Sequence, residues 1–230
     1  MANRTPFAPG EWYHCYNRGV DKRKVFESRR DYERFLLLMC ASKYKNNIRI
    51  SNYKNWSFQE IINDESLVSG SQIVELGAYS LMPNHIHFAL KETKEGGVAT
   101  FMQKVFTGYT MYFNLKNERT GSLFSGTFKS RHVFDDKYFK HLISYIHLNP
   151  VELIEPGWKE GKGSLKNIKH FLSRYGYSSL PEFSGVRRPE NKITDLSVLE
   201  LFDKVPTTKE MLADAQAYYQ ECSKVKPCYK

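Results

Sequence analysis

His85 and His87 are separated by one residue, Ile86, in the segment HIHFALK. In a β-strand, alternate side chains point to the same face, so the two imidazoles would lie side by side with their Cα atoms about 7 Å apart. Ile86 would then point the other way, toward the core. Neutral imidazole is a common ligand of divalent metals. The spacing predicts a two-histidine metal site, although pairs of this kind also arise by chance.

A second pair, Tyr145 and Asn149, lies in the segment KHLISYIHLN and is separated by four residues, so both would share one face of a helix. The amide oxygen of asparagine is a hard ligand suited to Mg²⁺ or Mn²⁺. The phenol of tyrosine is a nucleophile once its proton, with a pKa of about 10, has left. When the helix is considered alone, an ordinary packed stripe formed by Tyr138, Leu142 and Tyr145 is the better interpretation.

Other histidines and tyrosines compete for the same roles. His147 is two residues from Tyr145 and belongs to another helix face, so it is left out of the site. Tyr109 and Tyr112 are rival nucleophiles, but their apolar helical stripe favours core packing. The remaining candidates are expected to be structural or surface residues: His14, His132 and His141.

The elements that would position these side chains follow from hydrophobic periodicity and from breakers of regular structure. Strands are predicted at 11–18, 71–82, 85–91 and 129–134. Helices are predicted at 31–45, 98–117 and 135–149, with shorter ones near 58–63 and 209–222. The order β-α-β-β-α-β-α predicts an α+β, ferredoxin-like antiparallel sheet with helices on one face, followed by the helix that carries Tyr145.

We divide the chain into a catalytic domain at 9–155 and a basic C-terminal extension at 156–230. Residues 46–70 are polar and irregular in pattern, and we interpret them as an insertion. The positive charge of the extension is the one reason to expect that it binds DNA. The basic residues that suggest this are Lys162, Lys166, Lys169, Arg187 and Arg188.

Composition favours a polyanionic partner. The 230 residues carry 34 Lys and Arg against 25 Asp and Glu, a formal charge of +9. No apolar run is long enough to span a bilayer and no secretory signal is visible, so a cytoplasmic protein is expected. Four cysteines without CxxC spacing are expected to be free thiols: Cys15, Cys40, Cys222 and Cys228.

Nucleic-acid contacts are expected from basic residues near two of the strands, because phosphate contacts give salt-dependent affinity. The candidates are Arg18, Lys22, Arg23, Lys24, Lys129 and Arg131. Aromatic side chains could stack on bases or fill the core. Those considered are Trp12, Tyr13, Phe124 and Phe128.

Together, MPNHIHFAL, the long helix after it and YIHLNPV resemble the single-tyrosine transposases of the HUH superfamily, in which two histidines flank a hydrophobic residue. Three further segments make the REP-associated tyrosine transposases the closest resemblance: YHCYNRGVDKRKVF, GSLFSGTFKSRHV and YGYSSLPEF. The resemblance covers roughly residues 9–183.

This resemblance implies specific roles. His85 and His87 would be the paired ligands of Mg²⁺ or Mn²⁺, Asn149 a third ligand, and Tyr145 the nucleophile. Family members act on single-stranded DNA beside a hairpin and form a 5′-phosphotyrosine with a free 3′-hydroxyl. They rejoin strands without ATP. The resemblance leaves open a monomer or a homodimer, and a tyrosine helix that acts in its own chain or in a partner's.

Two other functions fit the same residues. A ferredoxin-like sheet with aromatics could bind single-stranded nucleic acid without chemistry. A metal phosphoesterase would use water instead of Tyr145, and would form no covalent adduct.

Overall fold

The computed structural model describes residues 6–46 and 48–225, with side chains up to residue 218. Four strands form one antiparallel sheet in the order β2-β3-β1-β4. Their bounds are β1 (Trp12–Arg18), β2 (Val74–Met82), β3 (His85–Glu92) and β4 (Lys129–Val133). This order and the helices between the strands confirm the predicted ferredoxin-like fold.

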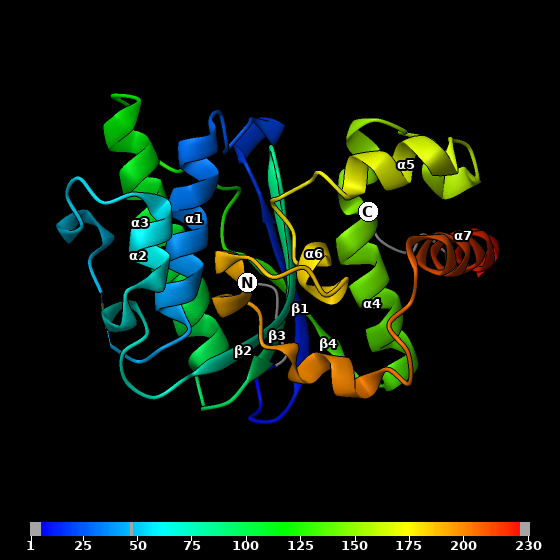
Figure 1. The fold of residues 1–230 in the computed structure, drawn as a ribbon, viewed down its shortest axis with the longest axis horizontal. Helices are drawn as coiled ribbons and strands as arrows, with labels where there is room; N and C mark the ends of the chain where they lie inside the picture. The colour runs from blue at the N-terminus through cyan, green and yellow to red at the C-terminus, as the bar shows by residue number, and fades with distance from the viewer. Residues whose placement is uncertain (1–5, 47, 226–230) are drawn as a thin grey trace.

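Two helices, α1 (Arg29–Ser42) and α3 (Gly97–Lys116), cover one face of the sheet (Figure 1). The Asp31 side chain accepts hydrogen bonds from the backbone N–H groups of Glu27 and Ser28, which starts α1 two residues earlier than predicted. The main hydrophobic core lies between these helices and the sheet. Its fully buried members include Phe35, Phe88 and Tyr109.

The opposite face of the sheet is covered by α4 (Asp136–Leu148), the helix that carries Tyr145 (Figure 1). Asp135 caps its N-terminus by accepting a 2.6 Å hydrogen bond from the N–H of Tyr138. The helix ends at Leu148 and tightens into a 3-10 turn, η4 (Asn149–Leu153), with Pro150 in the first turn. Its apolar side packs on small residues of the sheet, Ala78 and Ala89.

The segment 46–70 has more structure than its polar sequence suggests. It contains η2 (Ile50–Asn52), α2 (Phe58–Asn63) and η3 (Glu65–Leu67), and α2 has the predicted bounds. Ile61 and Ile62 are buried and α2 packs on α1. The segment therefore contributes to the main core.

Most of the chain after residue 155 packs on the α4 side of the sheet, while residues 189–193 reach the other side, where Ile193 joins the main core (Figure 1). The elements after residue 155 are η5 (Trp158–Glu160), α5 (Leu165–Leu172), α6 (Leu180–Phe183), η6 (Pro189–Lys192), η7 (Leu196–Leu201) and α7 (Thr208–Val225). Only α7 was predicted. The segment 177–179 runs antiparallel to the outer side of β2, with Ser178 bridging Ser80 and the N–H of Ser179 donating to the carbonyl of Tyr79.

Cys15 and Cys40 are buried, and neither forms a disulfide among the described residues, as the sequence predicted. Cys228 and the side chain of Cys222 lie outside the described residues. Within residues 6–46 and 48–225, no helix is long and apolar enough to cross a membrane.

Candidate active site

The site forms between the sheet and α4 because of the way β1 and β3 pair. The register sets Tyr16 opposite His87 and His14 opposite Ala89. Cross-strand partners point to the same face, so Tyr16, His14, His85 and His87 all point toward α4. Ile86 lies in the main core on the other face. The alternation expected from the sequence is therefore present.

The rings of His85 and His87 are 5.2 Å apart and perpendicular. Each has its Nδ1 atom in a hydrogen bond: His85 Nδ1 with Asn84 Oδ1 at 2.7 Å, and His87 Nδ1 with His14 Nε2 at 2.9 Å. In both rings Nδ1 is thus engaged, so a cation would have to bind at Nε2.

Tyr145 faces these rings from α4. Its ring stands edge-on to His87, with centroids 5.3 Å apart, and edge-on to His14 at 5.9 Å. Asn149 lies one turn later, and its backbone N–H donates to the Tyr145 carbonyl. The structure therefore brings Tyr145, Asn149, His85 and His87 of one chain together.

Burial and hydrogen bonding set the ionisation of these groups. Burial lowers the pKa of His87 well below its usual value, and the neighbouring His14 and His85 lower it further. Burial also lowers the pKa of His85, while hydrogen bonding to Asn149 opposes that shift. The pKa of the Tyr145 phenol is raised by burial, and its hydrogen bond to Asn149 opposes the rise. Both histidines are thus held neutral, the form that binds a metal.

The side chains of the site fit a hard divalent cation only if the amide oxygen of Asn149 joins the two histidines as a ligand. Among the described residues, no group of three or more His, Cys, Asp or Glu side chains could hold a metal ion. Two imidazoles and the Asn149 oxygen would leave positions for water and phosphate, which suits Mg²⁺ or Mn²⁺. Asn149 is 3% exposed, and its Nδ2 has no hydrogen-bond partner among the described atoms. Buried polar atoms are normally hydrogen-bonded, and a bound substrate could supply the acceptor that Nδ2 of Asn149 lacks.

Three of the predicted DNA-binding cations lie on the face of the sheet that bears the histidines. Lys129 and Arg131 pair across from Tyr16 and His14, and Arg18 pairs across from His85. All three side chains are exposed. The other candidates, Lys22, Arg23 and Lys24, are exposed in and after the turn η1 (Val20–Lys22) at the end of β1.

The aromatic residues considered for base stacking are mostly committed elsewhere. Tyr13 and Phe124 are buried in the main core, so the stacking role is wrong for both. Trp12 packs on Phe139, with centroids 4.9 Å apart. Phe128 stacks on Phe7 at 6.2 Å. The sequence alone did not reveal that Trp12 and Phe128 pack on other aromatic rings of the chain.

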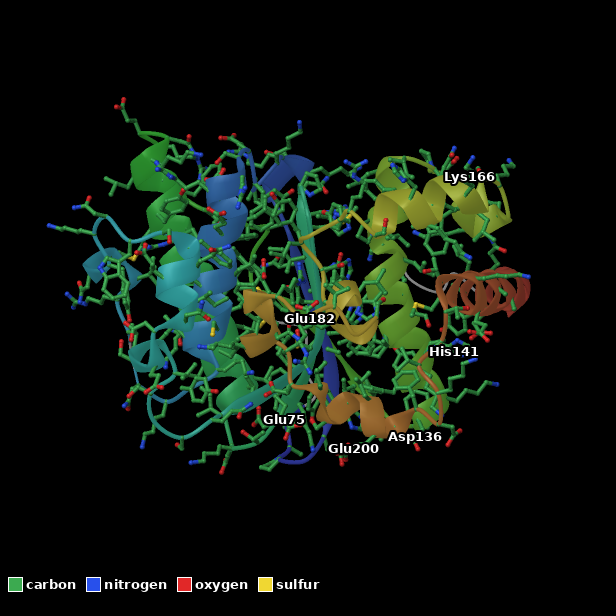
Figure 2. All side chains as sticks on the ribbon, viewed as in Figure 1. Glu75, Asp136, His141, Lys166, Glu182 and Glu200 are labelled. Carbon is green, nitrogen blue, oxygen red and sulfur yellow. The ribbon has the colours of Figure 1, made fainter. Side chains whose placement is uncertain are left out.

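The C-terminal basic residues do not form one group. Arg188 is 14% exposed and bonds both carboxylate oxygens of Glu182, whose side chain is fully buried. A DNA-gripping role for Arg188 is therefore wrong, because its charge is committed within the fold. Figure 2 shows Glu182 near the middle of the molecule and Lys166 on the outer helix α5. Lys166 is exposed.

The hydroxyl groups of the two rival tyrosine nucleophiles form hydrogen bonds within the fold. Tyr109 is fully buried and donates to the Val25 carbonyl, and Tyr112 donates to Asp31 at 3.0 Å. His147 faces away from the site and bonds Ser179 Oγ at 2.8 Å.

Two site residues were not expected. His14 was assigned a structural or surface position, and Tyr16 was not considered, yet Tyr16 stacks on His14 at 4.9 Å and on His87 at 5.6 Å. The signal available in the sequence was their alternation within YHCYNR, which places both on one strand face.

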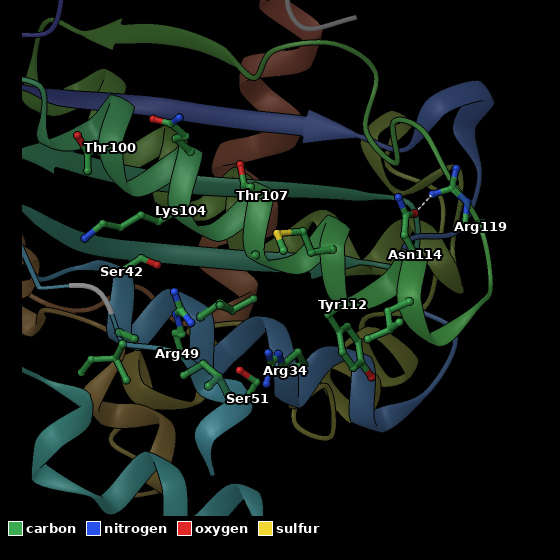
Figure 3. A pocket seen from close by; sticks show the side chains of 18 of the residues that line it. Arg34, Ser42, Arg49, Ser51, Thr100, Lys104, Thr107, Tyr112, Asn114 and Arg119 are labelled. Carbon is green, nitrogen blue, oxygen red and sulfur yellow. Dashed lines mark hydrogen bonds between the residues drawn. The ribbon is translucent and has the colours of Figure 1, made fainter. Parts of the chain in front are cut away.

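A large groove lies elsewhere. It encloses about 1670 Å³ between α1 and α3, on the side of the sheet away from the histidines, and includes none of the site residues (Figure 3). Its lining joins apolar side chains such as Leu38 and Met111 to cations such as Arg34 and Lys104. Cavity size therefore does not mark the site, which is identified by converging side chains.

The chain matches one family pattern, described as Transposase IS200 like, over residues 12–149. That range spans all four strands and the site residues from His14 to Asn149. No curated protein matched the chain. Among solved structures, the chain is similar to a REP-associated tyrosine transposase bound to a REP hairpin. The identity is 14%, the TM-score is 0.48, and the match covers 86% of this chain and 96% of that chain.

Proposed function

The chain belongs to the family of IS200-like transposases, and from that premise we propose that it nicks and transfers single-stranded DNA through Tyr145. The observation that carries this proposal is the convergence of Tyr145, His85, His87 and Asn149 within one chain. The proposed DNA lies beside a short hairpin, in keeping with the resemblance to the REP-associated group.

In the proposed reaction the Tyr145 oxygen attacks the phosphorus of a scissile phosphodiester. The bond from phosphorus to the 3′-oxygen breaks, the phenol loses its proton, and the departing 3′-oxygen gains one. The 5′-phosphate is then esterified to Tyr145. Attack by a 3′-hydroxyl reverses these steps, so strand transfer needs no external energy source.

The cation in this proposal would be held by Nε2 of His85, Nε2 of His87 and Oδ1 of Asn149. A bound Mg²⁺ or Mn²⁺ supplies Lewis acidity at a phosphate oxygen and offsets its charge. The protein itself supplies orientation: α4 holds the phenol edge-on to His87, and the hydrogen bonds at Nδ1 fix both imidazoles. Exposed Arg18 and Arg131 flank this face and would attract the DNA backbone.

The test is incubation of the purified chain with a labelled single-stranded hairpin oligonucleotide and Mn²⁺, followed by a denaturing gel. We expect a slow protein–DNA band that is lost in Y145F, with DNA binding retained. Y16F is the matched control, because Tyr16 is the other tyrosine that contacts His87, and it should keep the band.

The two alternative functions predict different results in this gel experiment. A pure binding module gives no band with any divalent metal while it still shifts the oligonucleotide on a native gel. A phosphoesterase that uses water cleaves the DNA without a band and stays active in Y145F. Loss of the band in Y16F and not in Y145F would assign the nucleophile to Tyr16.

A further inference from the structure

His14 occupies an unusual position for a polar side chain. It is 1% exposed, in the middle of β1, on the face of the sheet against which α4 packs. A buried polar group is costly unless it is hydrogen-bonded. Its Nε2 atom meets that need with Nδ1 of His87, at 2.9 Å. The two rings lie nearly parallel, 5.1 Å apart at an angle of 22°.

The polarity of this hydrogen bond decides what His87 can do. A neutral imidazole carries one proton, so one nitrogen donates and the other accepts. If His14 donates, then Nδ1 of His87 is the acceptor, its proton sits on Nε2, and Nε2 cannot bind a cation. If His87 donates from Nδ1, its Nε2 carries the lone pair toward His85 and Tyr145.

His85 provides a comparison within the same site. Its Nδ1 bonds the Oδ1 atom of Asn84, and an amide oxygen only accepts. His85 is therefore fixed with its proton on Nδ1 and its lone pair on Nε2. If both rings bind the cation through Nε2, His87 must also carry its proton on Nδ1. His14 Nε2 would then accept a hydrogen bond from that proton, as Asn84 Oδ1 does for His85.

We propose that His14 is a positioning residue that accepts the Nδ1–H of His87 and so presents the Nε2 lone pair of His87 to the divalent cation. The inference rests on the proposed function, because it assigns His14 a role in that cation site. Histidine ligands of metals commonly donate their second ring N–H to an acceptor such as a carboxylate, a carbonyl or water, which fixes the ring and raises its basicity.

The test compares H14L, which cannot accept a hydrogen bond, with H14Q, whose amide oxygen can. Mn²⁺ affinity is measured by electron paramagnetic resonance of the free ion, without DNA. We expect H14L to bind Mn²⁺ about 10- to 100-fold more weakly than wild type, the usual effect of losing such a partner. H14Q should restore most of the affinity, which a purely space-filling role would not achieve.

A second readout needs neither metal nor a folded H14L variant. Long-range ¹H–¹⁵N spectra of the histidine rings in the wild-type protein report which nitrogen of each ring is protonated. We expect the His87 proton on Nδ1, as for His85. A His87 ring protonated on Nε2 would overturn the proposal, and so would a folded H14L variant with wild-type Mn²⁺ affinity.

Failure of the proposed function looks different. If the wild-type chain binds no Mn²⁺, the cation site itself is refuted, and the role of His14 falls with it. If the wild type binds Mn²⁺ and H14L binds it equally well, only the role of His14 is refuted. Thermal unfolding of H14L and H14Q shows whether either change acts through stability instead.

Discussion

The ring of Tyr145 stands perpendicular to the ring of His87, at 88° and 5.3 Å between centroids, and both belong to the same chain. We therefore expect the nucleophile and the cation ligands of the proposed reaction to act in cis. A mixture of Y145F and H87A proteins should then form no covalent DNA adduct, since neither chain has a complete site. Recovery of the adduct in the mixture would show that α4 is exchanged between two chains.

Asn149 is expected to contribute directly to cation binding. N149A should weaken Mn²⁺ binding by at least about 10-fold, or roughly 1.4 kcal/mol, because it removes the hard oxygen donor. N149D should keep the affinity, since a carboxylate oxygen is also a hard ligand. The measurement is Mn²⁺ titration by calorimetry. N63A is the matched control, because Asn63 also ends a helix but is exposed on α2. Unchanged affinity in N149A would remove Asn149 from the site.

Arg131 is expected to contact the DNA backbone. R131A should weaken single-stranded DNA binding and reduce the slope of log affinity against log salt by about 0.7, the value for one phosphate contact. Fluorescence anisotropy at several salt concentrations measures both. The exposed Lys54 lies in the turn before α2, a helix that packs on α1, and K54A should change neither. Equal slopes for wild type and R131A would contradict this assignment.

The ion pair of Lys43 and Asp195 joins the end of α1 to the C-terminal extension, with Nζ and Oδ2 at 2.7 Å. The Lys43 side chain is 2% exposed, so D195A leaves a buried cation and should cost about 3–5 kcal/mol of folding free energy. K43M removes that cation and should cost less, on the order of 1 kcal/mol. Urea denaturation gives both values. A larger loss for K43M than for D195A would show that this account of buried charge is wrong.

The lowered pKa of Asp31 should make the stability of the fold depend on pH. Burial raises the pKa of Asp31, but hydrogen bonds from Lys116, the Glu27 N–H and Tyr112 lower it more, so the net pKa lies below 3.8. A lowered folded-state pKa stabilises the fold above the unfolded pKa of about 4, and this stabilisation is lost as the pH falls through the folded value.

Comparing wild type with D31N tests this dependence. Thermal melts should show the wild-type Tm falling faster than that of D31N as the pH decreases from 4 to 2. At pH 7, D31N should be less stable by roughly 1–3 kcal/mol, because the neutral amide bonds Lys116 more weakly. Parallel curves for the two proteins below pH 4 would contradict the shifted pKa.

Local spacing in the sequence was enough to predict the residues that share an element. His85 and His87 share a strand face because they are two residues apart, and Tyr145 and Asn149 lie one helical turn apart. The bond between His14 and His87 could not be predicted in this way, because it joins residues 73 positions apart and depends on strand register. Arg188 resembled a surface cation although its partner lies only six residues away. Its buried partner, Glu182, is set by the path of the extension and not by local pattern.

The segment 177–179 has a consequence for any attempt to shorten the protein. The N–H of Leu81 donates to the carbonyl of Tyr177 and the N–H of Ser179 to that of Tyr79, so this segment satisfies backbone groups on the outer side of β2. Truncation after residue 155 would strip those partners away and leave a bare strand that could recruit other chains. A fragment ending there should aggregate, and expression of the shorter unit requires the chain through at least Ser179.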